Sequence, residues 1–180
     1  MRTITALMAT FALLSPTTSL GHEEGEDHYG PEQGDVEFTL GANGSNDNDF
    51  DAGGFGAATS LGFFLSEGFE LGARHNMTFF DSDDVDANFA AVTRGFLDYH
   101  FDFDRFQPFI GINSGLRYGN GEVDETGVIA PEWGLKLFVK EKAFILAMME
   151  YEWFFDDIDD ADDRADDGQF VYALGIGLTF

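Results

Sequence analysis

The sequence predicts an all-β protein, an eight-stranded antiparallel up-and-down transmembrane β-barrel. Three observations support this fold class. From Asp35 onward, apolar residues recur at every second position in eight segments, as they do in strands with one apolar face. The connections between these segments alternate between short and long. The chain also ends on Phe180 after a run of alternate apolar residues, and its 22 Gly suit tight turns and close strand packing.

The composition excludes several classes of protein. The 180-residue chain has a formal net charge of −25, yet it is 44% hydrophobic and contains 21 Phe, so it is not a disordered acidic tail. Nucleic acid is excluded as a partner because 34 acidic residues stand against 9 basic ones. Without Cys, the chain has no disulfide framework, thiolate metal site or Cys nucleophile.

The first segment, residues 1–21, predicts a secretory signal peptide. Arg2 provides a basic start, Ile4 to Leu14 an apolar core, and Ser19-Leu20-Gly21 a small-residue exit. An ordinary amphipathic first helix is the alternative. Residues 22–34 predict a flexible periplasmic lead-in, although its two His among acids could also collect a transition metal. The barrel would then span residues 35–180.

Eight strands follow from the alternation. In chain order they are Val36 to Asn43, Phe55 to Leu65, Phe69 to Phe79, Phe89 to Phe101, Pro108 to Tyr118, Val128 to Val139, Ala143 to Phe155 and Phe170 to Phe180. In the last of them, Ile176 and Leu178 share one face with Phe180, whereas Gly175 and Gly177 lie on the other. Most of these segments are close to the roughly 9 to 11 residues that a tilted strand needs to cross a bilayer.

The connections predict two different rims. The short turns are Ser66 to Gly68, Asp102 to Gln107 and Lys140 to Lys142. The long connections are Gly44 to Gly54, Phe80 to Asn88, Gly119 to Thr126 and Asp156 to Gln169, which carry 18 of the 34 acidic residues. Short turns at one end and long loops at the other are typical of barrels of the outer membrane.

A soluble barrel of the lipocalin type would show the same alternation with its apolar face inward. The second face is rich in Gly, which would make an unusual water-exposed surface but would leave room inside a narrow lumen. Many aromatic residues also fall near strand ends, as in interfacial girdles. The membrane barrel is therefore preferred.

The pattern of strands and the ending Phe170-Val-Tyr-Ala-Leu-Gly-Ile-Gly-Leu-Thr-Phe180 resemble the small eight-stranded outer-membrane proteins of the OmpA-barrel, OmpX and OmpW type. The resemblance covers residues 35–180. It implies a Gram-negative bacterial outer-membrane location and contact with outer-membrane lipid and lipopolysaccharide. It also implies insertion by the barrel-assembly machinery, whose recognition signal is similar to the alternate apolar residues Tyr172, Ile176, Leu178 and Phe180.

The inward face predicts an ion network. Arg74, Arg94, Glu132 and Glu150 are expected at mid-height, Arg117 with Glu152 above them, and Lys136 with Glu37, Glu70 and Asp98 below. Mutual pairing would make such charges tolerable inside the barrel. The network would plug the lumen, and an ion pathway is the alternative.

The function predicted is that of a small closed barrel with an envelope-structural or surface-interaction role through its acidic loops. An OmpW-like conduit for small or hydrophobic solutes is the alternative, supported by inward apolar residues: Phe64, Phe96, Phe109, Phe144, Leu146, Met148 and Phe154. No enzyme is expected, because His75 should face lipid, His100 lies at the rim opposite to the long loops, and no Ser accompanies either.

No cofactor is expected beyond loosely bound Ca²⁺ or Mg²⁺. Hard divalent cations suit the acidic loops, above all Asp157, Asp159, Asp160, Asp162 and Asp163. This run lacks the central Gly and distal Glu of an EF-hand loop, so a solvated acidic loop is the alternative.

Overall fold

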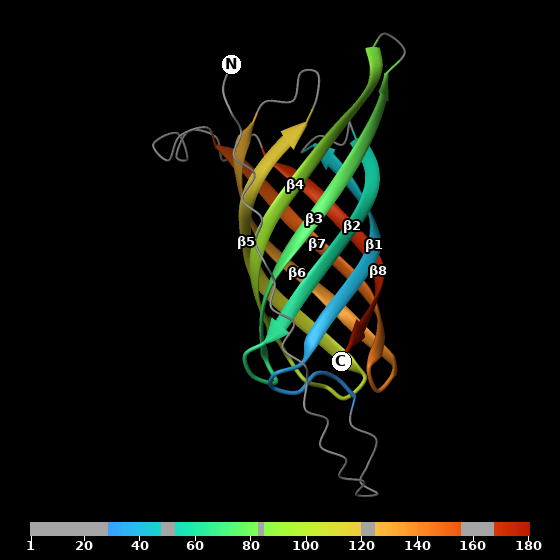
Figure 1. Cartoon of the computed structure of the whole chain (residues 1–180), viewed down its shortest axis with the longest axis vertical. Helices are drawn as coiled ribbons and strands as arrows, with labels where there is room; N and C mark the ends of the chain where they lie inside the picture. Colours follow the sequence, from blue (N-terminus) through green and yellow to red (C-terminus); the bar gives the residue numbers. More distant parts are fainter. Residues whose placement is uncertain (1–28, 48–52, 83–84, 120–124, 156–167) are drawn as a thin grey trace, which may run out of the picture.

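The computed structural model describes residues 29–47, 53–82, 85–119, 125–155 and 168–180, which form a closed barrel (Figure 1). Each strand pairs antiparallel with the next, and β8 pairs with β1. The strands are β1 (Val36–Asp47), β2 (Gly53–Phe64), β3 (Phe69–Ser82), β4 (Val85–His100), β5 (Phe106–Gly119), β6 (Thr126–Lys140), β7 (Ala143–Phe155) and β8 (Gln169–Thr179). The predicted all-β, up-and-down topology is confirmed.

The β3–β4 hairpin is longer than the sequence predicted. A long connection was expected from Phe80 to Asn88, but β3 continues to Ser82 and β4 begins at Val85, with a register irregularity between Phe80 and Ser82. The expectation was wrong because it followed the alternation of apolar side chains. The ladder itself is made by backbone groups, so it continues through polar residues.

The chain closes on itself through its last residue. Phe180 donates its backbone N–H to the carbonyl of Val36 and accepts from the N–H of Val36, each at 2.9 Å. The β1–β8 register then runs from Glu37 opposite Thr179 to Asp47 opposite Gln169. No free sheet edge remains at this junction, as a membrane barrel requires.

The short turns, the start of β1 and the end of β8 lie at one end of the barrel, at the bottom of Figure 1. Residues 29–34 of the predicted flexible lead-in are held at this end. Gly34 donates to the carbonyl of Phe64 at 2.9 Å, and Gly30 donates to that of Glu141 at 3.2 Å. Tyr29 packs against the buried cluster of the barrel and contacts Arg105. The predicted signal peptide and residues 22–28 lie outside the described residues.

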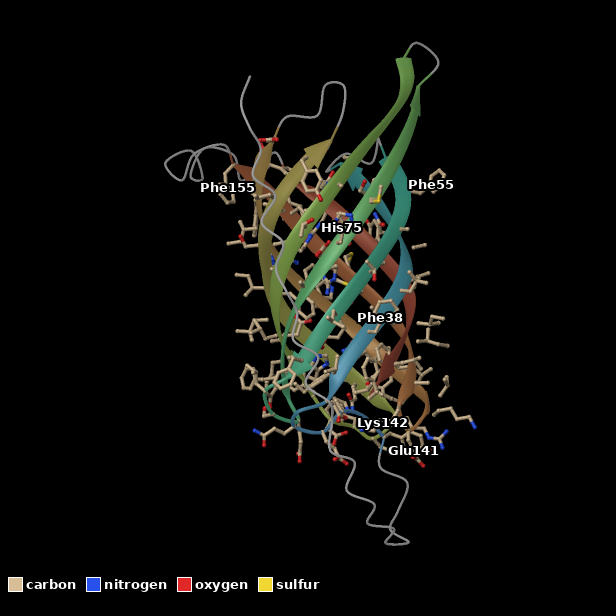
Figure 2. The ribbon with its side chains drawn as sticks, in the orientation of Figure 1. Phe38, Phe55, His75, Glu141, Lys142 and Phe155 are labelled. Atoms are coloured by element: carbon tan, nitrogen blue, oxygen red, sulfur yellow. The ribbon has the colours of Figure 1, made fainter. Side chains whose placement is uncertain are left out.

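The outward face is apolar. Leu40, Ile112 and Ile176 are 53%, 51% and 66% exposed, although each belongs to the middle of a strand. Figure 2 shows Phe55 and Phe155 projecting from the wall of the barrel. A soluble barrel would turn this apolar face inward. The outward orientation of the apolar side chains therefore excludes the soluble barrel and is compatible with a lipid bilayer around the protein.

Aromatic residues gather on the outward face at the end with the short turns. Tyr99 makes edge-to-face contacts with Phe69 at 4.9 Å and Phe101 at 5.0 Å between ring centroids. All three rings are between 39% and 45% exposed. This arrangement corresponds to a predicted interfacial girdle of aromatic residues.

Among the described residues, no helix is both long and apolar enough to cross a membrane.

Candidate functional site: the charged interior of the barrel

The middle of the lumen holds a network of ion pairs from four strands. Arg74 of β3 lies 2.6 Å from Glu132 of β6 and 3.5 Å from Glu150 of β7. Arg94 of β4 lies 2.9 Å from Glu150 and 2.6 Å from Glu152 of β7. The five side chains are at most 7% exposed. The network therefore joins strands on opposite sides of the barrel.

These charged groups point into the lumen because side chains alternate between the two faces of each strand. Small residues on the neighbouring strands lie beside them. Arg94 is paired across the sheet with Gly115, and Glu132 with Gly111. A Cβ at Gly115 would come 2.5 Å from the Cα of Arg94. Gly on the inward face thus allows β4 and β5 to approach closely beside Arg94.

Asn113 of β5 completes the network. Its amide nitrogen donates to Glu132 at 2.5 Å and to Glu150 at 2.7 Å, and its oxygen accepts from Arg94 at 3.3 Å. Buried ion pairs repay the cost of desolvation only when their remaining donors and acceptors are also satisfied. Asn113 provides this satisfaction between two carboxylates of like charge.

A second charged group lies nearer the short turns. Lys136 of β6 donates to Glu37 of β1 at 2.6 Å and to Glu70 of β3 at 2.9 Å. His100 of β4 contacts the same oxygen of Glu70 at 2.9 Å. The ammonium group also lies 5.4, 5.7 and 5.1 Å from the ring centroids of Phe64, Phe109 and Phe144, respectively. Cation–π attraction adds to its pairing with carboxylates.

The structure places the residues of the predicted ion network inside the barrel, but some of them have partners other than the expected ones. Glu152 is paired with Arg94 and accepts from Gln169 at 2.5 Å, whereas it was expected to pair with Arg117. The guanidinium of Arg117 instead lies 5.0 Å from the ring centroid of Phe154. Asp98, expected beside Lys136, has one buried oxygen without a hydrogen-bond partner in the described structure.

The sequence reasoning missed three interior groups: Asn113, His100 and Gln169. Asn113 and His100 have the same inward parity as the charged residues that were selected. A search of every inward polar side chain, rather than of charges alone, would have found these two. Gln169 was assigned to a loop, but it begins β8.

The rest of the lumen is filled by apolar side chains. Phe109, Phe138, Phe144, Leu146 and Met148 form a buried cluster in which each is at most 7% exposed. Above the cluster, a cavity of about 30 Å³ borders Arg94 and Glu152. Another of about 20 Å³ borders Arg74 and Met148. Each cavity is large enough for only one or a few water molecules.

Three polar side chains are connected by hydrogen bonds on the outward face of the barrel. His75 is one of them, and the sequence predicted this outward position for it. The Nδ1 atom of His75 lies 2.9 Å from the hydroxyl of Thr93, which lies 3.0 Å from the hydroxyl of Tyr118. Figure 2 shows His75 between the two ends of the barrel. The described structure places Thr and Tyr, rather than Ser and a carboxylate, beside this imidazole. That the chain is not an enzyme stays a prediction.

The other predicted site residues divide between the two ends. The metal candidates Asp157, Asp159, Asp160, Asp162 and Asp163 lie outside the described residues. The four residues of the predicted assembly signal lie in or directly after β8, with Ile176, Leu178 and Phe180 at 66%, 55% and 67% exposed. Their recognition by an assembly machinery is not tested by the structure.

No family profile matches the chain, and no curated protein matches it in sequence. Solved structures do match its fold. OprG from Pseudomonas aeruginosa is similar at a TM-score of 0.62 and 11% identity, over 84% of this chain and 98% of that one. Neisserial surface protein A is similar at 0.62 and 13%, over 81% and 96%. Ail of Yersinia pestis is similar at 0.59 and 13%, over 82% and 99%.

These identities are low enough that the likeness concerns the fold. Together with the apolar outward face and the closed strand order, it confirms the predicted architecture and agrees with the predicted location. The chain has the fold of the small eight-stranded β-barrel proteins of the bacterial outer membrane.

Proposed function

We propose that the chain is a closed outer-membrane barrel that acts through its acidic loops, in envelope structure or surface interaction, and does not conduct. The filled lumen is the observation that carries this proposal. Ion pairs with side chains at most 7% exposed cross the middle of the barrel, and a buried apolar cluster occupies the half nearer the short turns. A solute would have to break several buried ion pairs to pass.

Planar-bilayer recording tests the closed state. The purified barrel is expected to give no reproducible large conductance, while a general porin inserted in the same bilayer serves as the positive control. Steady open channels of nanosiemens size would contradict the proposal, because a lumen that is filled between its mouths cannot carry such a current.

An OmpW-like conduit is the second candidate. Its support is an apolar groove of about 360 Å³ on the outward face, formed by β1, β7, β8 and the end of β6. Phe144, which is 2% exposed, borders this groove and belongs to the buried cluster. Uptake of a small hydrophobic solute that depends on the protein, and is abolished by Ala143→Trp in the groove but not by Ile112→Trp on the far side, would favour the conduit.

The acidic loops are the proposed site of surface interaction. A related fold, that of Ail of Yersinia pestis, was solved in complex with the heparin analogue sucrose octasulfate. A polyanion of this kind would be repelled by long connections that hold 18 of the 34 acidic residues of this chain. We therefore propose that hard divalent cations, Ca²⁺ or Mg²⁺, bridge these loops to the phosphates of lipopolysaccharide.

Calorimetry at millimolar Ca²⁺, with and without lipopolysaccharide, tests the bridging. The expected result is cation binding that strengthens when the lipid is present. A variant with Asn at positions 157, 159, 160, 162 and 163 should lose most of it, whereas Asn at positions 102 and 104, in a short turn, should not. Absence of binding under both conditions would remove the bridging proposal.

The remaining proposed partner is the barrel-assembly machinery. The outward side chains of Ile176, Leu178 and Phe180 project from the wall of the barrel and contribute little to its interior. Such exposed alternate residues at the chain end suit recognition during insertion. We propose no catalytic activity for the chain.

A further inference from the structure

In the half of the lumen nearer the short turns, the carboxylates outnumber the cations. Glu37, Glu70 and Asp98 are between 2% and 3% exposed, and Lys136 is the cation that contacts two of them. Both oxygens of Glu37 accept from Lys136, at 2.6 and 2.7 Å, so this ammonium is largely committed to Glu37. Counted as fully ionised, three carboxylates against one ammonium leave a formal excess of two negative charges in this group.

Three potential ligands of the group converge. Glu70, Asp98 and His100 each place one ligand atom within 4.8 Å of those of the other two. Asp98 Oδ1 and His100 Nδ1 are buried without a hydrogen-bond partner in the described structure. His100 Nε2 lies 2.9 Å from Glu70, and in the tautomer that is protonated at Nδ1 it turns a lone pair toward this carboxylate, so a cation between them would contact both. An unpaired buried oxygen such as Asp98 Oδ1 is costly, and a cation that binds it removes this cost.

The surroundings hold these groups in place. A Cβ at Gly62 would overlap the carboxylate of Glu70, and a Cβ at Gly111 would overlap that of Asp98. The ring of His100 lies between those of Phe64 and Phe109, at centroid distances of 5.4 and 5.2 Å. Two glycines thus make room for the carboxylates, and two aromatic rings orient the imidazole and limit the access of water.

We propose that Glu70, Asp98 and His100 form a binding site for a divalent first-row transition metal ion of the zinc class. One imidazole nitrogen with two carboxylate oxygens is a ligand set that such ions accept, whereas Ca²⁺ and Mg²⁺ prefer oxygen alone. A divalent cation would balance the formal excess of negative charge. Ligands of tetrahedral Zn²⁺ at about 2.1 Å lie about 3.4 Å apart, so small side-chain rotations would close the site.

Zn²⁺ binding to the mature barrel, folded in detergent micelles and stripped of metal, tests the proposal. Millimolar Ca²⁺ in the buffer competes for sites made of oxygen ligands alone, so that the remaining isotherm reports sites containing nitrogen. The expected result is one equivalent of Zn²⁺. His100→Phe, which keeps a ring between Phe64 and Phe109, and Asp98→Asn should each weaken binding by at least about tenfold.

Two glycine variants distinguish a loss of the metal site from a general effect on folding. Gly111→Ala removes no ligand atom but displaces the carboxylate of Asp98, so it should also weaken Zn²⁺ binding. Gly95→Ala is its matched control, because the nearest atom to its Cβ would be 3.7 Å away. Heat-modifiable gel mobility verifies that each variant is folded, and the isosteric Asp98→Asn keeps the test decisive if His100→Phe or Gly111→Ala fails to fold.

Two outcomes would overturn the proposal. One is the absence of Zn²⁺ binding in the presence of Ca²⁺. The other is binding that persists in His100→Phe and Gly111→Ala but disappears when His22 and His28 of the lead-in are changed to Gln. Neither outcome bears on whether the barrel conducts or whether its loops bind Ca²⁺, so the proposed function is tested separately.

Discussion

Arg94 shows how this barrel tolerates a charge in its interior. Its side chain is 1% exposed, and its guanidinium donates to Glu150, Glu152 and Asn113. Arg117 faces the same lumen but is only partly buried, and its guanidinium stacks on Phe154. The two arginines therefore share a chemical group and an interior position but differ in the number of partners they satisfy.

Arg94→Met is expected to destabilise the folded barrel by about 3 to 5 kcal/mol, because it leaves the buried Glu152 without its cation and Glu150 with only the more distant Arg74. Arg117→Met, the matched control, should cost about 1 kcal/mol, since it removes a cation–π contact near the surface. Urea unfolding in lipid vesicles measures both. Equal losses would contradict the role given to the ion network.

At the scale of the strand, small residues decide how closely the strands and their interior groups approach. Gly115 of β5 is paired with Arg94 of β4, and a Cβ there would collide with the carbonyl oxygen of Thr93. That carbonyl belongs to the ladder, so it cannot rotate aside as a flexible side chain could. Gly95 on β4 faces outward and has open space instead.

Gly115→Ala is expected to destabilise the barrel by about 1 to 3 kcal/mol, through separation of β4 from β5 and displacement of Arg94. Gly95→Ala should change the free energy of unfolding by less than about 0.5 kcal/mol. Denaturant midpoints, read from the loss of heat-modifiable mobility, provide the comparison. A neutral Gly115→Ala would show that the ladder adjusts at this position.

At the scale of the whole molecule, charge is distributed along the barrel axis. The long connections carry 18 of the 34 acidic residues, while the turn that includes Glu141 and Lys142 lies at the opposite end (Figure 2). In the lumen between them, arginines and a lysine pair with the glutamates. The net charge of −25 therefore belongs mainly to one rim.

Epitope tags test this orientation in cells. A tag inserted after Asp160 should be labelled on intact bacteria, because the long loops should face outward, and the protein should fractionate with the outer membrane. The same tag after Glu141 should be labelled only after permeabilisation. Labelling of the second tag on intact cells would reverse the orientation, and recovery of the protein in the soluble periplasm would contradict the membrane assignment.

The sequence predicted those properties of the fold and of the interior that depend only on neighbouring positions in the chain. The face on which a residue lies follows from the parity of its position, so Phe38 and Ile176 were assigned to the lipid side, and Arg74 and Glu132 to the lumen, from the sequence. The eight strands and the two types of connection followed from the same period. The ends of β3 and β4 did not, because backbone pairing extends beyond the last apolar residue.

The sequence by itself determined the strand number, the apolar outer face and the set of charges that share the lumen. Only the tertiary structure decided which of the mid-height charges meet: Arg74 with Glu132, and Glu152 with Arg94 rather than Arg117. Such pairs depend on the relative heights of side chains across the lumen. Those heights are set by the tilt and stagger of the closed barrel, which no single strand specifies.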